Sequence, residues 1–344
     1  MPDRRQFLKS ATAATLSAAG LPLFATAKDA APAVAGPTAK SAAETAVKAL
    51  YDSLTDKQKK EICFAWDHVD KTRGLLRTHV SNNWNITPHM VNSEFFTKEQ
   101  RGIIGDVFKG LVNPDWHKRF LQQLEQDNGG RAFGTAQSIA LFGEPGADKF
   151  EFVMTGRHQT IRADGNSEKH VAFGGPIFYG HAGKGQSGTE EKDHPDNVFW
   201  PQAVAANKVY TLLDEKQKKA ARVKTSPKES DVGFRGEKVK ERPGLLISEL
   251  TGDVRKELQK VLEVLVEPFR TEDRDECVAA LKKQGGLDAC RLSFFEDGDL
   301  GFDDVWDNWR IEGPSFVWYF RGDPHVHVWV NVADDAGVKL NARG

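Results

Sequence analysis

The stretch RIEGPSFVWYFRGDPHVHVWVNV, residues 310–332, decides the fold, because the strongest β signal of the chain coincides there with its only closely spaced histidine pair. Phe316 to Phe320 and His325 to Val332 are rich in aromatic and β-branched residues, which favour strands. Arg321 to Pro324 separates them and contains a glycine and a proline, as turns do. The stretch therefore predicts an antiparallel hairpin.

The second strand of this hairpin places its histidines on one face. Side chains alternate between the two faces of a strand, so His325, His327 and Trp329 share one side. The opposite, core-facing side is expected to carry Val326, Val328 and Val330. Two imidazoles at positions i and i+2 lie about 6.5–7 Å apart at Cα, so both can reach one cation at the zinc–nitrogen bond length of about 2.0–2.1 Å.

Composition narrows the class of protein. The chain has 344 residues, a net charge of −2 and 28% charged residues, with basic and acidic residues interleaved, so neither a nucleic-acid partner nor a membrane-surface partner is expected. Cys63, Cys277 and Cys290 show no CxxC or zinc-finger spacing. Their spacing leaves open whether Cys277 and Cys290 form a disulfide.

The N-terminus resembles an export signal. Arg4 and Arg5 stand just before a weakly apolar run, and Ala25 to Ala27 fits a small-residue cleavage pattern, as in twin-arginine signals. We expect export by the twin-arginine translocase to the periplasm or beyond, with no membrane span in the mature protein. The expected organisation is a signal peptide over 1–27, an Ala/Pro-rich linker over 28–40, a single α+β domain over 41–335 and a tail over 336–344.

Helical and extended patterns come in blocks. Helices are expected at 97–111, 115–126, 201–221, 251–270 and 272–283. Strands are expected at 138–142, 150–161, 170–173 and 177–179, the middle two forming a hairpin around Ala163 to Asn166, and again from Cys290 onward. Such blocks favour an α+β fold, with a helical N-terminal part and helices packed on a mainly antiparallel sheet.

A short motif recurs with Thr55, Thr97 and Asp214 each three residues before a glutamine, and a looser copy surrounds Thr251. This is the capping-box pattern of a helix start. Because the intervals between copies are unequal, the motif is interpreted as helix capping rather than as an internal repeat.

His158 is the third metal-ligand candidate. In an unbroken strand over 150–161 its side chain would lie on the apolar side with Phe150, Phe152 and Met154, where an unpaired polar group is costly. A metal shared by His158, His325 and His327 would satisfy it, leaving an open position for water or substrate. Alternatively, His158 bonds to backbone or a carboxylate while His325 and His327 lie on a solvated face. The next candidates for a fourth ligand are Glu144 and His181.

Several phrases stand in a fixed order along the chain: FGEPGA at 142–147, GRHQT at 156–160, GPIFYG at 175–180, LDEKQK at 213–218, and RIEGP at 310–314 followed by HVH at 325–327. Together they resemble the family of domain of unknown function 3500 over about residues 54–332. The resemblance implies an arrangement of segments rather than a reaction. Family members typically show Gly-His-His in the middle strand, where this chain has Arg157 before His158, and an aromatic–His pair where it has Trp84-Asn85.

Two functions are open. The first is an exported metalloprotein, a hydrolase or an oxidase, holding one zinc or copper ion for an undefined small-molecule substrate. The second is a non-catalytic periplasmic binding protein with an aromatic-lined pocket for a ligand such as a sugar. The tryptophans available for such a pocket are Trp84, Trp200, Trp306, Trp309, Trp318 and Trp329.

Overall fold

The computed structural model describes residues 36–182, 194, 196–299, 304–322, 325–340 and 342. The signal peptide, most of the linker, and Asp323 and Pro324 of the expected turn lie outside them. The α-helices are α1 (Ala42–Ser53), α2 (Asp56–Ile62), α3 (Lys98–Leu111), α4 (Pro114–Asp127), α5 (Trp200–Leu212), α6 (Glu215–Ala221), α7 (Gly252–Val266) and α8 (Thr271–Lys283).

An eleven-stranded sheet forms the centre of the fold, in the order β1-β4-β5-β6-β7-β13-β12-β11-β10-β8 with β9 paired to β10. Its strands are β1 (Cys63–Phe64), β4 (Ser138–Gly143), β5 (Phe150–Gly156), β6 (Gln159–Ala163), β7 (Ile177–Ala182), β8 (Arg222–Val223), β9 (Leu245–Leu246), β10 (Arg291–Phe295), β11 (Asn308–Glu312), β12 (Phe316–Arg321) and β13 (His325–Val332). A separate small ribbon joins β2 (Val69–Asp70) to β3 (Gly74–Leu75). Most pairings are antiparallel, so the α+β prediction is confirmed, and so is the β12–β13 hairpin.

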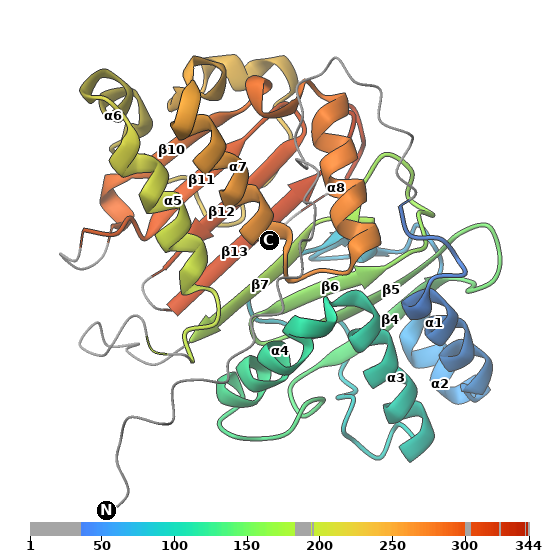
Figure 1. The fold of residues 1–344 in the computed structure, drawn as a ribbon. Helices are drawn as coiled ribbons and strands as arrows, with labels where there is room; N and C mark the ends of the chain where they lie inside the picture. The colour runs from blue at the N-terminus through green and yellow to red at the C-terminus, as the bar shows by residue number, and fades with distance from the viewer. Residues whose placement is uncertain are drawn as a thin grey trace, which may run out of the picture.

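The two faces of the sheet are covered differently. Figure 1 shows the helices on one face, with α5, α7 and α8 in front of β10–β13 and α3 and α4 beside β4–β7. Val326, Val328 and Val330 pack there in the main core, as the alternation predicted. The opposite face is covered by non-helical chain, because Val80 and Val232 pack on it beside Trp329. Residues 73–89 thus contribute to the layer that covers this face.

The same element order occurs twice in the chain. The first half contains α1, α2, β1, α3, α4 and β4–β7, and the second contains α5, α6, β8, α7, α8 and β10–β13. Read from each edge toward the centre, the sheet has the same strand order in both halves: β1, β4, β5, β6, β7 in the first and β8, β10, β11, β12, β13 in the second. The outermost pairs, β1–β4 and β8–β10, are both parallel. The halves meet where β7 pairs with β13. The recurring motif forms capping boxes at Thr55, Thr97 and Asp214, as predicted. The argument against an internal repeat was wrong, because connections of different length conceal the equivalence.

Three predicted elements differ from the structure. Residues 150–161 do not form one strand, because a two-residue turn at Arg157 and His158 separates β5 from β6. Residues 170–173 are not its hairpin partner, since a 3-10 helix occupies Ala172–Gly174. The helix expected over 201–221 ends at Leu212, and Asp214 caps a new one. A period-two or helical pattern does not reveal where the backbone reverses.

Two further findings concern the thiols and the membrane. All three cysteines are free and Cys277 and Cys290 are buried, so the disulfide is not formed. None of the described helices combines the length and apolar composition needed to cross a membrane.

Candidate metal centre

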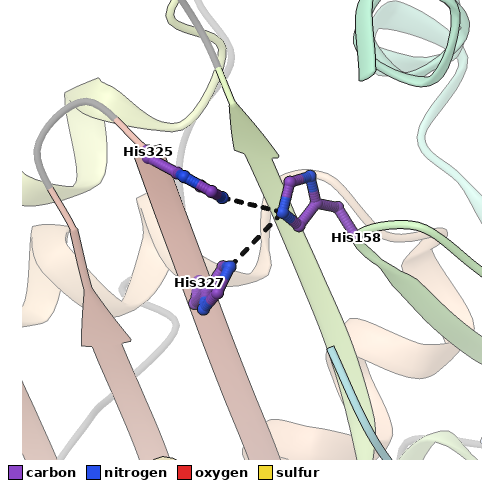
Figure 2. A group of neighbouring side chains, drawn as sticks. All are labelled: His158, His325 and His327. Carbon is purple, nitrogen blue, oxygen red and sulfur yellow. Dashed lines mark hydrogen bonds between the residues drawn. The ribbon is translucent and has the colours of Figure 1, made fainter. Parts of the chain in front are cut away.

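Three histidine side chains converge from two segments far apart in sequence. The Nε2 atom of His158 lies 2.9 Å from Nε2 of His325 and 3.3 Å from Nε2 of His327. The three ligand atoms all lie within 4.8 Å of one another. Figure 2 shows His325 and His327 on β13 and His158 reaching them from the far side of β7. Four nitrogens around one zinc ion are about 3.3 Å apart at a bond length of about 2.0–2.1 Å, so the spacing fits a shared ion.

A glycine between the two segments allows the imidazoles to meet. His327 pairs with Gly180 on β7, and the Gly180 N–H donates to the carbonyl oxygen of His158 at 3.2 Å, which places the three residues in one row across the sheet. A Cβ atom at position 180 would lie 2.3 Å from the carbonyl oxygen of Val326. The close approach of β7 and β13 therefore requires glycine, and no side chain comes between the histidines.

His158 occupies a strained position in its turn. Its φ of 56° is unusual for a residue other than glycine and costs about 1–3 kcal/mol. The Asn82 carbonyl accepts a hydrogen bond from its N–H at 2.9 Å and so fixes the turn. The equivalent turn of the second half, Pro314 and Ser315, has the same length and no positive φ. The fold can thus build this turn without a histidine, which points to a functional reason for His158.

Asp127 orients His158 from the helical side. Asp127 is the last residue of α4. Its carboxylate accepts four hydrogen bonds: from His158 Nδ1 at 2.8 Å, His181 Nδ1 at 3.1 Å, Gln123 Nε2 at 2.7 Å and the Ala182 N–H at 2.9 Å. A carboxylate at a helix C-terminus is unfavourable by the helix dipole. Burial acts to raise the pKa of Asp127, but the hydrogen bonds from both histidines outweigh it and hold the pKa well below its ordinary value. Asp127 is therefore an ionised anchor.

Glu229 orients His327 in the same way from the other face. One of its oxygens lies 2.8 Å from His327 Nδ1 and 3.2 Å from Trp329 Nε1, and the other lies 2.7 Å from an Arg321 nitrogen. Burial favours a raised pKa for Glu229, yet these contacts lower it. Each of the two carboxylates thus fixes one histidine through its Nδ1 atom.

These contacts determine the protonation of the cluster. Because an ionised carboxylate only accepts hydrogen bonds, Nδ1 of His158 and of His327 carries the proton in each neutral ring. Their Nε2 lone pairs then point at each other. Burial lowers the pKa of His158, and burial with the neighbouring histidines lowers the pKa of His325 to about 4. His158 and His325 consequently favour the neutral form, which is the form that binds metals.

The structure brings together the three predicted ligands but neither proposed fourth ligand. Glu144 is exposed in the turn between β4 and β5, at the opposite end of β5 from His158. His181 pairs with Val326, so its side chain lies on the other face of the sheet from His327, where it contacts Asp127. His158 is in a turn rather than on a strand face. The alternative is correct in that His158 bonds a carboxylate, that of Asp127. His327 is 8% exposed, so the solvated face is wrong for it.

Asp127 and Glu229 were not identified from the sequence. Asp127 had one local signal, an acidic residue closing a helix whose last turn lacks a basic residue. Glu229 lies in a charged stretch without a recognisable pattern, and only its contact with β13 reveals its role.

The tryptophans do not form a common wall. Trp200, Trp309 and Trp318 are buried in the main core, and Trp306 packs against it. Trp329 belongs to the cluster on the opposite face, and Trp84 packs against a third cluster. Their positions are accounted for by packing on both sides of the sheet.

Comparison with known proteins identifies the family. A search of curated proteins found no match, and a search of solved structures found none either. The family model described as protein of unknown function (DUF3500) matches residues 37–332, which include the whole histidine cluster and both carboxylates. The chain therefore belongs to the DUF3500 family.

Proposed function

We propose that this protein is an exported metalloenzyme that holds one transition-metal ion, zinc in the first place, through Nε2 of His158, His325 and His327. The observation that carries the proposal is the 3.3 Å contact between Nε2 of His158 and Nε2 of His327. Both atoms present lone pairs because both Nδ1 atoms donate to carboxylates. Two facing lone pairs repel unless a cation lies between them.

The arrangement supports hydrolysis. Three neutral imidazoles leave one coordination position for water, and zinc in such a site lowers the pKa of bound water to about 7. Carboxylates on the outer nitrogens raise the basicity of the ligands and fix the rings. His325 is partly exposed, which gives a substrate a side of approach, whereas His158 and His327 are buried. A copper-dependent oxidase would use the same ligands, and the identity of the bound metal decides between them.

Export and domain organisation complete the proposal. Arg4, Arg5 and the Ala25–Ala27 pattern support a twin-arginine signal with a mature N-terminus near Lys28. N-terminal sequencing of periplasmic material tests this, and Arg4→Lys with Arg5→Lys should block export. We also propose that residues 41–335 fold as one domain, which the continuous sheet across both halves supports.

Metal analysis of the untagged protein tests the metal centre. About one zinc per chain is expected in the wild type and in His117→Ala, a control on the surface side of α4. His327→Ala should retain almost none. Equal, negligible metal in all three proteins, together with melting temperatures unaffected by chelator, would refute the metal centre.

A further inference from the structure

The charges around the histidine cluster balance before a metal is added. Asp127 and Glu229 supply two negative charges, and both are committed to orienting histidines. Arg321 pairs with Glu229 at 2.7 Å, and Arg157 stands directly before His158 in the β5–β6 turn. Because an imidazole that binds a metal is neutral, a divalent ion would leave an excess of about two positive charges in a partly enclosed site. Such an excess attracts anions.

Arg157 is free to meet an incoming ligand. Its side chain is exposed, and among the described residues it forms no ion pair. Arg157 and His158 are the two residues of the turn between β5 and β6, so the guanidinium belongs to the residue next to a ligand of the site. No described carboxylate holds it away from the ligand position.

The fold does not require an arginine there. In the second half the equivalent hairpin turn is built by Gly313, Pro314 and Ser315. The Ser315 carbonyl accepts a hydrogen bond from the Ala333 N–H at 2.8 Å, as the His158 carbonyl does from the Gly180 N–H. Pro314 thus occupies the position of Arg157. A guanidinium beside a divalent ion weakens metal binding by repulsion, so for a purely structural metal site Arg157 would be a disadvantage.

We infer that the metal centre takes an anionic ligand, a carboxylate or a phosphate group, with one oxygen at the open metal position and another on the guanidinium of Arg157. This inference rests on the proposed metal centre and names the substrate class of the same site. The guanidinium offers two parallel N–H donors that match two anionic oxygens, a geometry that a lysine ammonium does not reproduce. An anion in this position also offsets the repulsion between Arg157 and the metal.

Cobalt provides a visible probe of the open position. Apoprotein is reloaded with Co²⁺, which accepts the same nitrogen ligands, and its absorption spectrum is followed during titration with inorganic phosphate or acetate at constant ionic strength. Acetamide serves as the neutral comparison. We expect at least one of the two anions to change the spectrum with saturation, and acetamide to leave it unchanged. The more tightly bound anion identifies the group recognised.

Arg157 is tested by three variants. Arg157→Gln should weaken anion binding by at least about tenfold while cobalt stoichiometry stays at one, because a charge-assisted hydrogen bond is lost. Arg157→Lys should recover only part of the affinity, and Arg119→Gln, an exposed arginine on α4, should match the wild type. Equal affinity in Arg157→Gln and wild type, or no response to either anion, refutes the inference but leaves the metal centre intact. Failure of the wild type to bind cobalt refutes both.

Discussion

Asp127 Oδ2 and His158 Nδ1 lie 2.8 Å apart, joining the end of helix α4 to the turn between β5 and β6. Both residues are in positions that the backbone disfavours, one a carboxylate at a helix C-terminus and the other at a φ of 56°. Each is stabilised by the other, and together they fix the direction of the His158 lone pair.

Asp127→Asn should weaken metal binding by about 10–100-fold without removing any ligand, since the partner that fixes the His158 ring is no longer an ionised acceptor. Competition with a coloured chelator measures the affinity. Glu125→Gln, a change on the exposed side of the same helix, is the matched control. If Asp127→Asn binds metal as tightly as Glu125→Gln, the orienting role of Asp127 is wrong.

Gly180→Ala should destabilise the protein by about 1–3 kcal/mol, because the new Cβ would lie 2.3 Å from the Val326 carbonyl oxygen and β7 would have to move from β13. Metal affinity should fall too, since His158 and His327 face each other across this position. Urea unfolding measures the stability. Gly102→Ala, on α3 with no atom near its Cβ position, should instead stabilise by about 0.5–1 kcal/mol. A Gly180→Ala protein as stable as wild type would contradict the packing argument.

Chelation should lower the melting temperature of the wild type but not of His327→Ala. An ion that binds only the folded state stabilises it by about 2.7 kcal/mol when its free concentration is a hundred times the dissociation constant. For a chain of this size that corresponds to a change of several degrees. Calorimetry with and without chelator measures it. Identical shifts in both proteins would mean that the chelator acts elsewhere.

The contribution of Glu276 on α8 to stability should fall as pH rises. Burial, together with the nearby Asp164 and Asp273, raises the pKa of Glu276 to about 9, whereas the unfolded value is about 4.3. Its contribution is therefore fully present below about pH 4.3 and is lost as pH rises through about 9.

Glu276→Gln keeps an acceptor for the Phe173 N–H and removes this titration. Its melting temperature should exceed that of wild type at pH 9 and approach it at pH 5. Scans in chelator separate the effect from metal binding, and Glu263→Gln on the exposed side of α7 is the control. Parallel curves for wild type and Glu276→Gln would rule out the raised pKa.

The sequence predicted local features best. Alternation in β13 correctly placed Val328 in the core and His327 on the other face, since that signal lies within one strand. The sequence correctly grouped His158 with His325 and His327 but wrongly placed it within a strand. Apolar alternation on both sides of position 158 concealed the turn. Asp127 and Glu229 could not be found, as their roles arise from contacts about 30 and 100 residues away in sequence. The repeated architecture was missed because secondary structure recurs without equal spacing.

The repeated architecture also shows that the histidine cluster depends on both halves of the molecule. A ligand set made of equivalent residues would occur twice in a molecule with two like halves, yet Pro314 and Ser315 stand where Arg157 and His158 stand. Gln284, the residue after α8, accepts a hydrogen bond from the Ser315 N–H, whereas Asp127, the last residue of α4, bonds the His158 ring. The histidine cluster is not repeated in the second half, because His158 comes from one half and His325 and His327 come from the other. Neither half carries all three histidines, so exchanging one half for a copy of the other would break the cluster even where the sheet was preserved.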